Sequence, residues 1–279
     1  MQIQKRKKLK TNLFMRKLNV SLTSVLVIVC CSLLYTSDCY NYVIFEGDIV
    51  LRFNPHDRAA ILLTGSKWSN GVVPYKFIEP IDSEDAFSDV HKQLIRSAMD
   101  YIEEQSCTTF VELDNSDDND VENNQVQDYV GITTHRGCSA ELGRQRGYNQ
   151  LSLDTSYCMD HGTIVHELMH SLGFIHEHSR VDRDEHIEIL WENIAEQYKK
   201  DFQIYSSADI DHLGFEYDLR SVMHYESSAG AIESDSQTLK PLDASISDRE
   251  LGLGKKLGYL TQLDKLKLNK FYECNKDNE

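Results

Sequence analysis

Apolar positions in the first half of the chain follow two periods, one typical of strands and one typical of helices. Four short runs rich in β-branched or alternating apolar residues predict strands, at 71–78, 108–113, 128–134 and 149–154. After the first of these, residues 83–105 repeat apolar side chains at helical spacing and predict a long helix. This order of strands and helix indicates a mixed sheet with helices packed on it, which is an α+β fold.

Two single residues refine the pattern. Ser83 is a good N-cap, so the long helix is expected to begin there. Pro74 has no amide hydrogen, so the first strand is expected at an edge of the sheet. Further helices are predicted over 161–172 and 260–274, and the weak signals between them predict an irregular C-terminal half.

The N-terminal segment differs from the rest of the chain. Residues 1–20 hold seven basic side chains and no acidic one, and residues 20–35 are apolar and uncharged. This pattern is typical of a secretory signal, and the apolar run is shorter than the roughly 20 residues that a membrane span needs. We expect a signal peptide over 1–39, with a retained membrane anchor as the alternative. The polar stretch 40–58 that follows is too short to hold a core of its own.

Cysteine usage and charge agree with export. Without the signal peptide an even number of cysteines remains, which predicts two disulfides with three possible pairings. These cysteines are Cys107, Cys138, Cys158 and Cys274. The net charge of −16 disfavours nucleic acid as a partner and favours solubility.

The stretch HELMHSLGFIHEH, residues 166–178, has the spacing of a metal site. His166 and His170 are four residues apart, so both face the same side of a helix. A continued helix would carry His176 about 280° away, so the helix must end first, and Gly173 can adopt the left-handed backbone that ends helices. Three imidazoles without a nearby cysteine are typical of a catalytic zinc site with one open position.

Glu167 directly follows the first histidine, where it can flank the open position and accept a proton from water. The full pattern His-Glu-x-x-His-x-x-Gly-x-x-His is specific, because several fixed residue types must coincide. The alternative is a solvated helix rich in histidine. His178 fits no ligand position and is expected to pack near the site, whereas His161 and His186 are expected to be structural.

Four segments resemble the astacin family of metzincin metalloproteases. Residues 166–184, HELMHSLGFIHEHSRVDRD, resemble the family signature, and SVMHY at 221–225 resembles its Met-turn. RAAILLTGSKWSNGVVPYKF at 58–77 resembles the mature N-terminus of the family, and FEGD at 45–48 resembles its propeptide motif. The resemblance covers residues 44–274.

The resemblance implies a metzincin-like fold, in which an N-terminal mixed sheet with two long helices and an irregular C-terminal half border a cleft. It implies a secreted endopeptidase with one Zn²⁺ per subunit that hydrolyses peptide bonds of proteins. His166, His170 and His176 would be the zinc ligands, and Glu167 the general base. Tyr225 would be a fifth, switchable ligand that also stabilises the developing oxyanion.

The resemblance also implies a mechanism of latency. Asp48 would ligate the zinc in the zymogen and keep it inactive. A trypsin-like protease would cleave between Arg58 and Ala59, and the new amine of Ala59 would pair with Glu177. Met223 would lie beneath the metal as a hydrophobic floor.

Further expectations concern the organisation of the chain. The family's disulfides would join Cys107 with Cys274 and Cys138 with Cys158. The parts would be a signal peptide (1–39), a propeptide (40–58) and a catalytic domain (59–279). We expect a monomer without stable membrane association, which acts on protein or peptide substrates. An extended substrate is expected to add as a strand at the sheet edge near 149–153.

Two other classes remain open. A non-catalytic binding protein could keep this fold, but the presence of Glu167, all three histidines and Tyr225 favours an enzyme. A different metzincin class is disfavoured by Glu177 directly after the third histidine and by the start at Ala59. Ser139 stands where the family commonly has an aromatic residue, and this departure concerns substrate preference.

Overall fold

The structure is a computed structural model that describes residues 41–53, 66–78, 86–113, 127–134, 137–205 and 211–274. The chain divides into two compact units, one of residues 1–43 and 51–59, the other of residues 44–50 and 60–279. The expected signal peptide and the bond between Arg58 and Ala59 lie outside the described residues.

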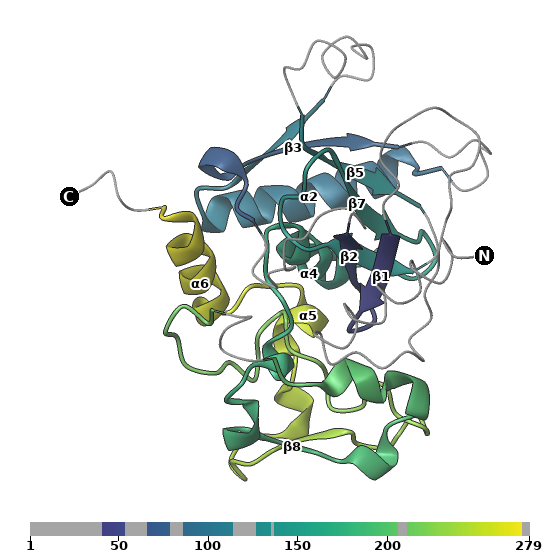
Figure 1. Ribbon diagram of the computed structural model, residues 1–279, viewed down its shortest axis with the longest axis vertical. Coiled ribbons are helices and arrows are strands. Elements are labelled where there is room, and N and C mark those ends of the chain that lie inside the picture. The colour runs from purple at the N-terminus through teal and green to yellow at the C-terminus, as the bar shows by residue number, and fades with distance from the viewer. Residues whose placement is uncertain are drawn as a thin grey trace, which may run out of the picture. The chain divides into compact units, whose positions relative to one another are not determined.

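A seven-stranded mixed sheet has the order β1-β2-β6-β7-β5-β3-β4 (Figure 1). The strands are β1 (Asn41–Phe45), β2 (Ile49–Phe53), β3 (Val72–Phe77), β4 (Thr109–Glu112), β5 (Tyr129–Thr133), β6 (Cys138–Glu141) and β7 (Tyr148–Leu153). β6 runs antiparallel to β7, whereas the pairs β2–β6, β5–β7, β3–β5 and β3–β4 are parallel. The four strands predicted from the sequence are present, and the fold is α+β as predicted.

The expected edge position of β3 is wrong. β3 lies between β5 and β4 and pairs with both. Its register with β5 begins at Tyr75, one residue after Pro74, so the missing amide of Pro74 falls at the end of that ladder. The sheet edge on this side is β4.

The substrate edge expected near 149–153 is also wrong, because β7 is an interior strand between β5 and β6. β6 has the sequence CSAE, which contains no β-branched or aromatic residue and therefore predicts no strand. On the other side of β6, β2 pairs with it through Ile49 and Val50, which stand opposite Ala140 and Glu141.

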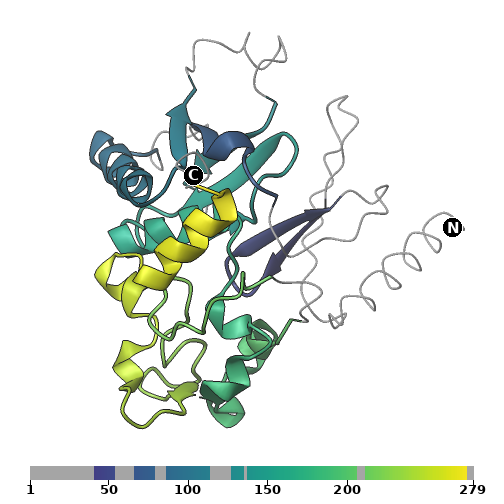
Figure 2. The same ribbon diagram turned by 90° about the vertical axis from the view of Figure 1, so that its left-hand side faces the viewer.

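Two helices, α2 (Asp89–Gln105) and α4 (His161–Ser171), pack side by side against one face of the sheet (Figures 1 and 2). α2 begins after Ser88, whose hydroxyl accepts the amide hydrogen of His91. The helix therefore begins later than predicted, and the expected cap Ser83 lies outside the described residues. Between helices and sheet, the core contains Ile95, Met99, Ile102, Ile132, Leu151, Leu153, Ile164 and Leu168, each at most 1% exposed.

The C-terminal half is irregular, as predicted. Its regular elements are short: β8 (Ile187–Ile189), β9 (Leu239–Pro241), α5 (Leu253–Leu257) and α6 (Gln262–Tyr272). The 3₁₀ turns of the described chain are Ser69–Gly71, Glu177–Ser179, Arg183–Glu185, Trp191–Asn193, Glu196–Phe202 and Asp248–Glu250. A second small core gathers around Phe202, Leu239 and Leu251. Among the described residues, no helix has the length and apolar character to cross a membrane.

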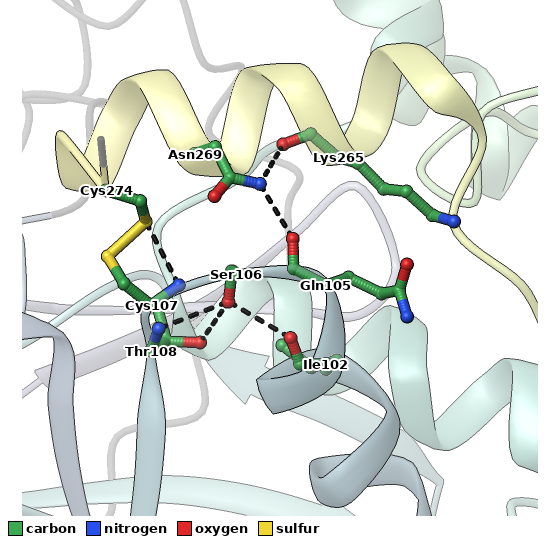
Figure 3. The surroundings of a disulfide bond; sticks show 8 residues. All are labelled: Ile102, Gln105, Ser106, Cys107, Thr108, Lys265, Asn269 and Cys274. Carbon is green, nitrogen blue, oxygen red and sulfur yellow. Dashed lines mark hydrogen bonds between the residues drawn. A yellow bond between two sulfur atoms is a disulfide. The ribbon is translucent and has the colours of Figure 1, made fainter. Parts of the chain in front are cut away.

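Two disulfides are formed, Cys107–Cys274 and Cys138–Cys158, which is the pairing that the resemblance implies. The first joins residues 167 positions apart and ties the end of α6 to the end of α2 (Figure 3). A loop of this length constrains the unfolded chain by about 5 kcal/mol in the entropy model. Beside the disulfide, the Asn269 amide donates hydrogen bonds to the carbonyl oxygens of Gln105 and Lys265.

Gly162, at the start of α4, packs against α5 without room for a side chain. A Cβ atom there would lie 1.8 Å from the carbonyl oxygen of Lys255. Because backbone must move to make room, we expect Gly162→Ala to lower the free energy of unfolding by about 2–3 kcal/mol. Denaturant unfolding measures this, with Thr163→Ala as the control, which should change stability by less than about 0.5 kcal/mol. Equal effects of the two substitutions would contradict this close packing.

Candidate metal centre

The break after α4 brings the third histidine back to the first two, as the spacing predicted. α4 ends at Ser171, and Gly173 follows with a left-handed φ of 105°. The amide of Gly173 donates to the carbonyl of His170 at 2.9 Å, which caps the helix. The chain then reverses, and the imidazoles of His166 and His176 stack with their ring centroids 5.2 Å apart.

Four side chains converge on one point: His166, His170, His176 and Asp48. The Nε2 atom of His166 lies 3.1 Å from Nε2 of His170 and 3.3 Å from Nε2 of His176. Asp48 places one carboxylate oxygen 3.3 Å from His166 and the other 3.3 Å from His176. A tetrahedral zinc ion with bonds of about 2.0–2.1 Å separates its ligand atoms by roughly 3.3 Å, so the four groups fit zinc.

The hydrogen bonds of the three imidazoles also indicate a cation. Nδ1 of His166 lies 2.8 Å from the carbonyl oxygen of Val222, and Nδ1 of His170 lies 2.7 Å from that of Phe174. Nδ1 of His176 lies 2.7 Å from a carboxylate oxygen of Glu46. Because all three partners are acceptors, each Nδ1 donates, and the Nε2 atoms turn lone pairs toward one another. Such an arrangement is repulsive unless a cation lies between them.

Local charges act on the protonation of these histidines. Burial lowers the pKa of both His166 and His170, which keeps these imidazoles neutral and able to bind metal. Burial also acts to lower the pKa of His176, but the carboxylates of Asp48 and Glu46 outweigh it and raise the pKa to about 10. The two carboxylates therefore favour a positive charge at this point, whether a proton or a metal ion.

Both carboxylates come from the turn between β1 and β2. Glu46 and Gly47 adopt left-handed backbone with φ of 50° and 86°, and this turn points Glu46 and Asp48 toward the histidines. Glu46 is 1% exposed and also accepts a hydrogen bond from the hydroxyl of Ser179. The sequence analysis of FEGD singled out Asp48 alone; the signal for Glu46 was a second carboxylate two residues earlier.

Glu167 is the buried carboxylate next to the first histidine on α4. Its side chain is fully buried, and neither of its oxygens has a hydrogen-bond partner among the described residues. Burial raises the pKa of this carboxyl well above its ordinary value, and the nearby charge of Asp48 raises it further. A buried carboxyl without a partner costs stability, so its orientation is available for a ligand rather than for the fold.

The Met-turn connects this site to the C-terminal half. Met223 is buried, and its carbonyl oxygen accepts the amide hydrogen of Glu177 at 2.8 Å. The Tyr225 hydroxyl donates to the carbonyl oxygen of Glu46, and its ring stacks on His178 with centroids 3.8 Å apart. His178 is buried against the site as predicted, with Nε2 3.0 Å from a backbone carbonyl of Asp201.

The other histidines and Glu177 lie apart from the ligand cluster. His161 places Nδ1 3.0 Å from the carbonyl oxygen of Gly258, and His186 stacks on the ring of Tyr217 with centroids 4.6 Å apart. Both positions are structural, as predicted. The carboxylate of Glu177 turns away from the histidines and binds Lys267, which the sequence analysis did not single out.

Three histidines joined by a helix, a glycine break and a return, with a glutamate beside the first, define a metzincin type of zinc centre. The comparisons agree: the family model for Astacin, a family of peptidases, matches residues 61–273. The chain therefore belongs to the astacin family.

Individual relatives support this assignment. The chain is 35% identical over 210 residues to zinc metalloproteinase nas-6 of Caenorhabditis elegans, covering 74% of this chain and 54% of that protein. It is 32% identical to the low choriolytic enzyme of Oryzias latipes, covering 83% and 78% of the two chains. A solved structure of high choriolytic enzyme 1, a hatching enzyme zinc-protease of the same fish, matches with a TM-score of 0.63 and 29% identity, covering 78% and 98%. The chain thus spans about half the length of the nas-6 relative.

Proposed function

We propose that this protein is a secreted zinc endopeptidase made as a zymogen. The observation that carries the proposal is the convergence of three histidine lone pairs beside a buried glutamate without a partner among the described residues. His166, His170 and His176 would hold one zinc ion, and the substrate would be a protein or peptide chain. Bound zinc supplies Lewis acidity, which polarises a carbonyl and makes a coordinated water acidic.

The residues of the chain divide the remaining work. Glu167 accepts the proton of the attacking water and passes it to the nitrogen of the departing amine. Its carboxylate suits this role because it makes no hydrogen bond among the described residues that a proton transfer would break. After the turn carrying Glu46 departs, the Tyr225 hydroxyl is free to turn toward the site and stabilise the oxyanion.

The segment 44–50 suits the role of an inhibitor. Asp48 lies among the three histidines, and Glu46 engages both His176 and the hydroxyl of Tyr225, the latter through its carbonyl oxygen. β2 pairs with β6 through Ile49 and Val50, so it also covers the strand edge to which an extended substrate would add. Cleavage by a trypsin-like protease between Arg58 and Ala59 would let this segment leave, and the chain would then act as a monomeric enzyme outside the cell.

The proposal is tested on full-length zymogen, without its signal peptide, before and after cleavage at Arg58. We expect about one zinc ion per chain by atomic emission and hydrolysis of a casein or quenched peptide substrate only after cleavage. A zinc chelator should reduce the rate at least tenfold, and stoichiometric zinc should restore it. A cleaved protein that holds zinc and hydrolyses none of a broad peptide library would favour the non-catalytic alternative.

A further inference from the structure

Glu177, the residue directly after the third histidine, has its carboxylate fully engaged inside the protein. Lys267 brings its ammonium 2.6 Å from one carboxylate oxygen and 2.7 Å from the other. The first oxygen also accepts from the guanidinium of Arg180 at 3.0 Å and from the amide of Asp218 at 2.9 Å. The side chains of Glu177 and Lys267 are 8% and 7% exposed, so the pair is screened little by solvent.

These contacts fill the carboxylate. An ionised carboxyl group offers about four acceptor positions, and four N–H···O contacts meet Glu177. A further donor would therefore have to displace one that is already buried. Leaving either partner unpaired would be strongly unfavourable, because a buried charge without a partner keeps its desolvation penalty.

The position of Lys267 is set by its helix rather than by Glu177. Lys267 and Asp264 are three residues apart on α6, so they share one face, and both are buried. Asp264 accepts hydrogen bonds from the hydroxyl of Ser221 and the amide of Val222, which fixes this face against the Met-turn. The disulfide of Cys274 holds the other end of α6 (Figure 3).

Arg180 is held in a similar way on the opposite side of Glu177. Its guanidinium forms a bidentate pair with Asp182 and donates to the backbone carbonyl oxygens of Phe215 and Glu216. Both cations are therefore in place before they meet the carboxylate, so little side-chain entropy remains to be lost when they bind it.

We propose that Lys267 is a positioning residue, the built-in cation that holds Glu177 and the adjoining His176 in place independently of any chain terminus. The inference rests on the proposed function, and it differs from the pairing of Glu177 with a new amine at Ala59 that the resemblance implies. Glu177 donates its backbone amide to Met223, so its placement bears on both the third histidine and the Met-turn. With Lys267 in place, trimming or extending the cleaved N-terminus leaves this arrangement unchanged.

The test compares cleaved enzymes that differ only at the new N-terminus. Zymogens with one residue deleted, or two glycines inserted, directly after Arg58 yield chains that begin one residue later or two earlier than Ala59. We expect kcat/KM for a quenched peptide to agree within about threefold across the three forms. We also expect equal amide hydrogen exchange over residues 176–180. A loss of tenfold or more on altering the terminus of the wild-type chain would overturn the inference.

Substitutions then assign the effect to the side chain. Lys267→Met should lower kcat/KM and make it depend on the terminus by tenfold or more, with faster exchange over 176–180. Lys267→Arg should restore independence of the terminus. Lys265→Met is the matched control, since the Lys265 ammonium forms no ion pair among the described residues, and it should behave as the wild type. A Lys267→Met enzyme as indifferent to its terminus as the wild type would also contradict the inference.

Failure of this inference can be told apart from failure of the proposed function. If no form of the wild-type chain hydrolyses peptides, the proposed function is wrong, whatever the exchange data show. If all forms hydrolyse peptides but their rates follow the terminus, only the role of Lys267 is wrong. Should Lys267→Met fail to fold, the three wild-type forms still decide the question by themselves.

Discussion

Glu167→Gln should reduce kcat/KM for peptide hydrolysis by about 10²–10⁴-fold while the protein keeps its zinc. Glutamine has the shape of glutamate but cannot accept the proton of the attacking water, so the loss is that of general-base catalysis. The three histidines do not depend on Glu167 for hydrogen bonds, since their Nδ1 atoms bind Val222, Phe174 and Glu46. The measurement is a rate assay and a zinc analysis on the same preparation, cleaved after Arg58.

The structure also predicts the effect of this substitution on stability. Neither oxygen of Glu167 has a hydrogen-bond partner among the described residues, so the change breaks no contact there and removes a buried carboxyl group. Glu167→Gln should therefore melt at the same temperature or higher. Glu192→Gln, at an exposed carboxylate, is the control for a simple loss of charge and should keep full activity. Undiminished hydrolysis by Glu167→Gln would disprove the assigned role.

The second large effect is expected in the uncleaved chain. Asp48→Ala should give the zymogen at least about tenfold more hydrolytic activity than the uncleaved wild type, in which the segment 44–50 occupies the site. The reason is that both oxygens of Asp48 lie against the histidines, whereas alanine offers no ligand atom. An Arg58→Gln background prevents accidental activation, so the activity measured belongs to the intact chain.

The matched control for latency is Ile44→Ala. Ile44 lies in the same segment with its side chain about half exposed, so its loss should leave the zymogen inactive. When Arg58 is retained and the chain is cleaved there, Asp48→Ala and wild-type enzymes should have equal kcat/KM, because the segment has left. A silent Asp48→Ala zymogen would show that covering β6 is sufficient for inhibition without the carboxylate.

The parts of the site that could be predicted from sequence are those that depend on local geometry. The i, i+4 spacing of His166 and His170 and the break at Gly173 follow from helix dimensions alone. Glu46 and Lys267 could not be found in this way, because their partners lie 130 and 90 positions away. A lysine on an amphipathic helix is expected to face solvent, and only the buried Glu177 reverses that expectation for Lys267.

The errors in the fold have a related cause. Pro74 correctly indicates a missing hydrogen bond, but a ladder that begins one residue later removes the conflict without moving the strand to an edge. Val90 continues the helical spacing of α2, yet it is 71% exposed, because the helix begins with it in the first turn, where the sheet does not reach. In both cases the neighbouring element decides the outcome, and a single sequence does not reveal the neighbour.

The Cys107–Cys274 bond has a consequence for an enzyme that works among other proteases. It makes the chain from Cys107 to Cys274 a covalent ring that contains every proposed zinc ligand of the mature enzyme and the general base. One cut within this ring separates no fragment, so a nicked molecule keeps its mass until the disulfide is reduced. The bond between Arg58 and Ala59 lies outside the ring, and a single cut there does divide the chain into two pieces. The same chemistry, peptide bond cleavage, is thus irreversible at the activation site and can be survived almost everywhere else.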